Sequence, residues 1–149
     1  MEDFDTIYYF DKNYSYDSKS VELIVSNRRS LEGQLFVDRL LALLDVKAGM
    51  NQFRIAFWIN IVFNLDRITV VQKAYPPKNN HDLRHLHKQV VSSSVPDHQK
   101  QAVMYYLLKD CRGTNDAATQ FARRCYLPEN YRLFIEGLWH LDHLELRVS

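Results

Sequence analysis

Residues 51–74, NQFRIAFWINIVFNLDRITVVQKA, give the strongest helical signal in this chain. Phe53, Phe57, Ile61 and Leu65 recur every four residues, which is the spacing of one face of an α-helix. The β-branched and aromatic residues would also suit a strand, but roughly twenty residues without a turn signal far exceed an average strand. The length therefore favours a helix, and its wide apolar face predicts a position at the centre of the domain.

The most apolar part of this stretch is too short to cross a membrane. Residues 55–65 are interrupted by Asn60 and flanked by Arg54, Asp66 and Arg67, whereas a spanning helix needs about 18 apolar residues. The acidic N-terminus also lacks the basic start and apolar run of a signal peptide. We therefore expect a soluble domain without a membrane span.

Composition supports a helical fold of ordinary globular type. The chain has 149 residues, the size of one domain, with 46% hydrophobic and 25% charged residues and only four glycines and four prolines. Few helix breakers favour helices.

The net charge of +1 provides no concentrated positive field for a nucleic acid, which leaves a nucleic-acid adaptor as a weak alternative. Cys111 and Cys125 are too few for a disulfide framework and are expected to be buried, reduced thiols.

The rest of the chain divides into helical segments joined by short connections. Apolar residues repeat at intervals of three and four from Ser18 onward. The connections favour antiparallel stacking of successive helices, and no clean internal repeat supports a regular solenoid. We predict an all-α, irregular α-solenoid-like domain of seven or eight helices. Start signals lie at Ser18 or Ser20, Asn51, Asn79 or Asn80, Pro96, Thr114 or Asn115, and Pro128, and stop signals at Gly49, Pro76 and Gly113. Apolar residues from Leu31 to Leu44 define the helix that ends by Gly49.

Residues 1–17 form a separate, tyrosine-rich segment before the helical domain of residues 18–149. Its aromatic residues alternate with Asp and Asn and show no helical period. We predict an extended arm that lies in a groove, either of its own domain, which is the simpler alternative, or of a partner protein. Its candidate interface residues are Tyr8, Tyr9, Phe10, Tyr14 and Tyr16.

Two histidine groups raise the alternative of a metal-binding or enzymatic helical bundle. Helical spacing could place His81, His85 and His87 together, and likewise Glu136, His140 and His143. The zincin pattern, with Glu next to the first His of an i, i+4 pair, is absent, so we interpret both groups as ordinary helix-face side chains.

Residue patterns for catalysis and cofactor binding are also missing. Neither cysteine lies in an activated-thiol motif, no serine lies in a G-x-S-x-G turn, and no Gly-rich phosphate loop is present. We assign no catalytic, cofactor-binding or metal-binding residue. Asp38 and Arg39 are interpreted as surface charges, and residues 28–30 as a solvated turn between helices.

Three stretches of the sequence share features with a known family. They are RRSL (28–31) with GQLFVDRLL (33–41), YPPK (75–78) with KQAVMYYLLKD (100–110), and FARRCYLP (121–128) with FIEGLWHLDH (134–143). In this order and spacing they resemble the ELYS-like domain of fungal nuclear pore proteins. The likeness covers residues 18–143, and the last stretch is the most specific, because a helix that starts at proline and leads into G-x-W-x-L-D-H is not a general helical pattern.

This resemblance implies a helical scaffold nucleoporin in the nucleus, at the pore complex of the nuclear envelope. Its implied partners are other nucleoporins of the Y-shaped outer-ring subcomplex, and its implied role is in pore assembly and in protein and mRNA transport. It implies no cofactor, small-molecule substrate or direct nucleic-acid contact. Because the family continues with further helices, we expect the chain to be either a fragment or a minimal form, without the β-propeller and chromatin-binding tail of metazoan relatives.

The motif residues are best explained by packing. A buried Trp139 would bridge two helices and need an acceptor for its indole N–H, Gly137 would permit a bend or a close approach, and Asp142 would cap a final short helix. The residues that we assign to the fold in this way are Tyr75, Pro76, Pro128, Gly137, Trp139 and Asp142.

Overall fold

The computed structural model describes residues 3–31, 33–42, 44, 74–111, 114 and 116–144, and all regular structure in these ranges is helical. This confirms the predicted all-α class, whereas solenoid-like stacking stays a prediction. The helix predicted over residues 51–74, apart from Ala74, and the stop signals at Gly49 and Gly113 lie outside these ranges. The helices are α1 (Phe4–Ile7), α2 (Ser18–Ser30), α3 (Phe36–Ala42), α6 (Asn80–Ser92), α7 (Asp97–Lys109), α8 (Ala117–Arg124) and α9 (Glu129–Asp142).

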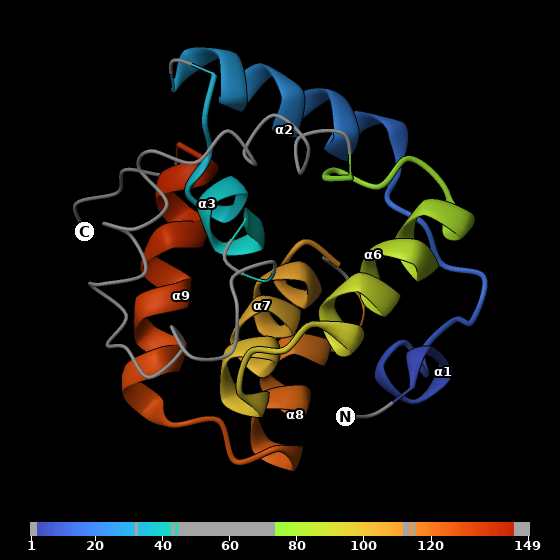
Figure 1. The fold of residues 1–149 in the computed structure, drawn as a ribbon. Coiled ribbons are helices and arrows are strands. Elements are labelled where there is room, and N and C mark those ends of the chain that lie inside the picture. The colour runs from blue at the N-terminus through green and yellow to red at the C-terminus, as the bar shows by residue number, and fades with distance from the viewer. Residues whose placement is uncertain are drawn as a thin grey trace.

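Helix α7 occupies the middle of this arrangement (Figure 1). It packs against α3, α6, α8 and α9, while α9 also contacts α2 and α3, and α1 packs on α6. Every residue from Ala102 to Leu108 is buried, so α7 is covered on all sides at this level. A helix that is apolar around its whole circumference belongs in the interior, which explains its central place.

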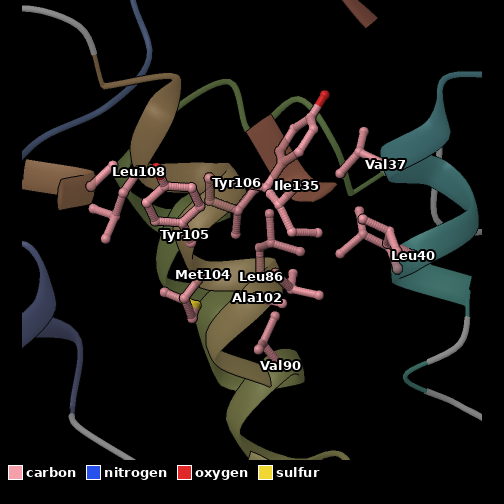
Figure 2. Packing of buried hydrophobic residues seen from close by; sticks show 14 of the residues in the cluster. Val37, Leu40, Leu86, Val90, Ala102, Met104, Tyr105, Tyr106, Leu108 and Ile135 are labelled. Carbon is pink, nitrogen blue, oxygen red and sulfur yellow. The ribbon is translucent and has the colours of Figure 1, made fainter. Parts of the chain in front are cut away.

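The core forms where the neighbouring helices place apolar side chains on α7. Figure 2 shows α3 and α6 contributing side chains from two directions, together with Ile135 of α9. Close packing of this kind makes the removal of even one methylene group costly. The labelled core residues are Val37 and Leu40 of α3, Leu86 and Val90 of α6, Ala102, Met104, Tyr105, Tyr106 and Leu108 of α7, and Ile135 of α9.

Several predicted helix starts are confirmed. The side chain of Asn79 accepts a hydrogen bond from the Asp82 N–H at 2.8 Å and caps α6. Helices α7 and α9 begin directly after Pro96 and Pro128, whose fixed φ suits entry into a helix.

Two predicted caps are wrong. Asp17, rather than Ser18 or Ser20, caps α2, because its carboxylate accepts from the Ser20 N–H at 2.7 Å. The cap position of α8 is Asp116, which has a φ of +57° and makes no capping hydrogen bond through its side chain. It takes the place predicted for Thr114 or Asn115, and Asp is one of the few residues that tolerates this left-handed conformation.

The helix predicted from Leu31 begins later, at Phe36. Leu31 instead ends α2, where its N–H donates to the Asn27 carbonyl at 3.0 Å. Gly33 then turns the chain with a φ of +87°, a conformation that favours glycine. Its N–H donates to the Arg28 carbonyl at 2.8 Å, which satisfies one of the last carbonyls of α2.

The N-terminal segment is folded onto its own domain and is not wholly extended. Asp3 accepts from the Thr6 N–H at 2.8 Å and caps the short helix α1. Phe4 stacks on Tyr8 with ring centroids 4.6 Å apart, and Phe4 packs edge-on against His87 of α6. Alternating Asp and aromatic residues gave no helical period, but one capped turn with two buried apolar side chains suffices for α1.

Asp38 is fully buried, so its predicted role as a surface charge is wrong. It forms a two-point ion pair with Arg28, with Nε–Oδ2 at 3.0 Å and Nη2–Oδ1 at 2.7 Å. Arg28 also donates to the Tyr75 carbonyl at 2.8 Å. The turn predicted over residues 28–30 is therefore helical and ties α2 to α3 and to the connection before α6.

Breaking this pair tests its contribution to stability. Arg28→Ala leaves the Asp38 carboxylate buried without its cation, and we expect the free energy of unfolding to fall by about 3 to 5 kcal/mol. Arg29→Ala is the matched control: Arg29 is exposed, and its loss should change stability by less than about 0.5 kcal/mol. Urea unfolding monitored by circular dichroism measures both. A cost for Arg28→Ala below about 1 kcal/mol would contradict the assignment.

Candidate functional site

The N-terminus of α3 is held by two buried carboxylates, one from α3 itself and one from the last turn of α9. Asp38 reaches back one turn to accept from the Leu35 N–H at 2.9 Å. Asp142 accepts from the Phe36 N–H at 2.6 Å and the Val37 N–H at 3.0 Å. The first N–H groups of a helix lack partners within it, and its positive end favours negative charge. Three of these donors are thus satisfied.

Asp142 belongs to the last turn of α9 and caps α3. The final short helix that it was predicted to cap would extend into residues 145–149, which lie outside the described ranges. The Tyr106 hydroxyl of α7 donates to Asp142 at 2.6 Å. One carboxylate therefore fixes three helices relative to one another. Burial raises the pKa of Asp142 from its ordinary value of 3.8 to about 6, against the opposing effect of its hydrogen bonds from Tyr106, Phe36 and Val37.

A third buried carboxylate, Asp110, lies at the C-terminal end of α7, accepts hydrogen bonds from three side chains and lies beside a fourth. Oδ2 accepts from the Tyr16 hydroxyl at 2.9 Å and the Tyr75 hydroxyl at 2.6 Å. Oδ1 accepts from Trp139 Nε1 at 2.8 Å and lies 3.1 Å from His143 Nε2. This cluster ties the N-terminal segment, the connection before α6, and α9 to α7.

Two tyrosines connect the carboxylate clusters. The rings of Tyr75 and Tyr106 meet edge to face, with centroids 6.1 Å apart, while their hydroxyls point to Asp110 and Asp142 respectively. Burial raises the pKa of both hydroxyls well above the usual value, so both stay protonated and serve as donors. The polar interior is a continuous network, in which each link supports the next.

The predicted fold-motif residues have mixed outcomes. Trp139 bridges α9 and α7 and finds the acceptor that its indole N–H needs. Tyr75 and Pro76 are buried, and the peptide bond between them is cis. Gly137 is exposed, and a Cβ added there would meet nothing within 4 Å. Among the described residues, therefore, no neighbouring element approaches Gly137 closely enough to require a glycine.

The histidine groups do not converge. Among the described residues, no three His, Cys, Asp or Glu side chains are placed to hold a metal ion. Glu136 accepts from the Tyr105 hydroxyl at 2.5 Å and from Arg132 at 3.2 Å. His143 stacks on Trp139 at 3.8 Å, and its Nδ1 lies 2.7 Å from the Trp139 carbonyl.

The cysteines are free thiols with different surroundings. Cys111 is buried, and burial raises its pKa to about 12. Cys125, predicted to be buried, is half-buried. A thiol with so high a pKa is protonated at neutral pH and is a poor nucleophile.

The candidate interface residues of the N-terminal segment are used largely within the chain. Tyr8 and Tyr16 are buried, and Phe10 and Tyr14 are partly buried against the same core. Tyr9 is 52% exposed; its hydroxyl donates to Gln120 Oε1, and its ring lies under the Arg124 guanidinium. Their use as a partner interface stays a prediction, and Tyr9 is the member best placed for it.

A family model described as ELYS, nuclear pore complex assembly, matches residues 34–149, more than half of the chain. The chain belongs to the ELYS family. The match contains α3 and α6 to α9, with the carboxylates Asp38, Asp110 and Asp142, whereas α1 and α2 and the donors Tyr16 and Arg28 precede it. The family indicates nuclear pore components as partners and a place at the nuclear pore. No curated protein and no solved structure matches the chain.

No described helix of this ELYS-family chain is long and apolar enough to span a membrane. The burial of Asp38 and Asp110 was not predicted from the sequence. Each aspartate comes after an apolar run, which is also where an exposed charge at the end of a helix would lie. The signal that the sequence offered was their place inside the stretches that resemble the family.

Removal of one hydroxyl tests the Asp110 cluster. Tyr75→Phe keeps the ring but deletes the donor to a buried carboxylate, and we expect the free energy of unfolding to fall by about 1.5 to 3 kcal/mol. Tyr126→Phe is the control, since Tyr126 is 88% exposed and its change should stay within about 0.5 kcal/mol. Equal effects of the two substitutions in urea unfolding would contradict the structural role of the cluster.

The raised pKa of Asp142 predicts a pH dependence of stability. Because the folded state favours the protonated form, this contribution is fully present below pH 3.8 and is lost as the pH rises through about 6. Asp142→Asn cannot ionise. The stability difference between the wild type and this variant should therefore shrink by up to about 3 kcal/mol between pH 4 and pH 7.

Urea titrations of both proteins at several pH values measure this difference. Asp142→Asn should be less stable than the wild type at pH 4, because the amide NH2 group that replaces one oxygen cannot accept a hydrogen bond, whereas the hydroxyl oxygen of the protonated carboxyl group still can. A difference that does not change with pH would contradict the assignment.

Proposed function

We propose that this chain is a structural nucleoporin whose helical body docks on the Y-shaped outer-ring subcomplex and supports nuclear pore assembly. The observation that carries the proposal is the ELYS family match over residues 34–149. Its location would be the pore complex of the nuclear envelope, where protein and mRNA transport would depend on it indirectly, through the integrity of the pore.

The use of the polar side chains supports a structural role. The buried carboxylates Asp38, Asp110 and Asp142 all accept hydrogen bonds that join separate helices. A scaffold needs a single, well-defined arrangement of its helices, and a satisfied polar network favours one arrangement over alternatives. Asp110 and Asp142 also contact residues from the family-like stretches, so the resemblance and the network share the same residues.

The alternative of a metal-binding or enzymatic bundle is less well supported. Glu136 and His143 are directed to different partners, and the Cys111 thiol is protonated at neutral pH because burial raises its pKa to about 12. Metal analysis of the purified protein separates the two functions, since one metal ion bound per chain would favour the alternative.

Affinity purification from cells that express the tagged chain tests the proposal. We expect subunits of the outer-ring subcomplex to be enriched over an untagged control, and fluorescence of the tagged chain to mark the nuclear rim. A chain that migrates as an isolated monomer and is spread evenly through the cell would contradict the proposal.

A further inference from the structure

His143 lies between two oxygen atoms at the C-terminal end of α9. Its Nδ1 is 2.7 Å from the Trp139 carbonyl, and its Nε2 is 3.1 Å from Oδ1 of Asp110. The ring stacks on the Trp139 indole with an angle of 21° between the planes, and only 8% of the His143 side chain is exposed. Packing therefore fixes the ring, with each nitrogen at hydrogen-bond distance from an oxygen.

Both oxygens act as acceptors. A backbone carbonyl has no proton to donate. Oδ1 of Asp110 already accepts from the Trp139 indole N–H at 2.8 Å, and Oδ2 accepts from the hydroxyls of Tyr16 and Tyr75. Burial raises the pKa of both tyrosines well above the usual value, so their hydroxyls keep their protons. Three donors from separate parts of the chain thus direct their protons to the carboxylate.

Only a doubly protonated His143 ring suits both acceptors. The imidazolium has an N–H at each nitrogen, whereas neutral imidazole has one N–H and one lone pair. In either neutral tautomer, the lone pair would face the Trp139 carbonyl or the Asp110 carboxylate. One hydrogen bond would then be lost, and two electron-rich atoms would be left in contact at a site that is largely closed to water.

We propose that His143 is a proton-dependent clasp, which attaches the C-terminal end of α9 to that of α7 while its ring is charged and weakens this attachment when the ring is neutral. Histidine changes its charge between about pH 5 and pH 8, so the clasp would respond in the physiological range. A cavity of about 60 Å³ between α2 and α9 borders His143 and Asp110. It is large enough for a water molecule, which can carry a proton to or from the ring.

The charges closest to the ring favour the imidazolium. Asp110 is in direct contact with it at 3.1 Å, and the negative end of α9 adds to the attraction, because His143 is the C-cap of this helix. Lys109 opposes it, since its Nζ lies over the Trp139 ring at 5.2 Å from the centroid. This effect is weaker, because the charge is more distant and lies 4.0 Å from Glu136.

Among the described residues, the other neighbours of the ring are uncharged, screened by water or directed elsewhere. From α2, the uncharged residues Ser20, Leu23 and Ile24 line the cavity beside it. His140 contacts the Trp139 indole edge-on, with centroids 5.4 Å apart, but is exposed, so water screens its charge. Asp142 is adjacent in sequence, but its carboxylate accepts from the first N–H groups of α3.

Nitrogen NMR of the isotope-labelled wild-type chain tests the clasp without any substitution. At about pH 5, both imidazole nitrogens of His143 should carry protons and have nearly equal chemical shifts. As the pH rises to about 8, the two shifts should separate, because one proton is lost. The variant His143→Gln lacks these signals and so assigns them. A ring with one protonated nitrogen at every pH, or a protonation state that does not change over this range, would overturn the inference.

Urea unfolding measures what the clasp contributes. The folded state favours the charged ring, so its contribution is present at low pH and is lost as the pH rises. The ratio of the unfolding equilibrium constants of His143→Gln and the wild type should therefore fall about tenfold between about pH 5 and pH 8, which corresponds to the loss of one hydrogen bond from a charged donor. Asp142 titrates in both proteins, so its effect cancels in the ratio.

His85→Gln is the matched control, because His85 is an exposed histidine of α6. Its ratio to the wild type should stay constant over the same pH range. Equal pH dependence of the two variants would show that His143 has no special role and would contradict the clasp. The inference does not depend on the proposed function, since these measurements use the purified chain alone and affinity purification tests only the binding of pore components.

Discussion

The N-terminus of α3 is the point on which the arrangement of the described helices depends. Its first N–H groups would be buried without partners if Asp142 did not accept from Phe36 and Val37, more than a hundred residues away in sequence. An unpaired buried donor costs about 1 to 3 kcal/mol, a large fraction of the stability of a small domain. Asp142 also accepts from Tyr106. This single carboxylate therefore fixes the positions of α3, α7 and α9 relative to one another.

The same logic extends through Asp110 to the N-terminal segment. Tyr16 and Trp139 both donate to Asp110, so a segment before the family match and a residue near its end share one acceptor. Apolar packing alone tolerates many similar arrangements of helices, whereas buried acceptors with fixed donors favour one. The proposed scaffold role would use that property, because the partners of a scaffold must meet a surface of constant shape.

The fold class followed from the sequence because helical periodicity and scarce breakers are local properties. The starts of α6, α7 and α9 were predicted for the same reason, since Asn79, Pro96 and Pro128 act within one turn. The roles of Asp38 and Asp142 could not be predicted, because an aspartate at a helix end looks the same whether it faces water or a distant helix. The burial of Tyr16 could not be predicted either, because it depends on the position of Asp110, and the two residues come together only in the tertiary structure.

A crosslinking map of intact nuclear pores tests the central claim, that this chain is a structural part of the pore, most directly. With lysine- and carboxylate-reactive reagents, the account predicts repeated crosslinks between the helical body of this chain and subunits of the outer ring, at distances that one fixed position of the chain satisfies. Crosslinks only to proteins outside the pore, or crosslinks within the chain and none to pore subunits, would contradict it.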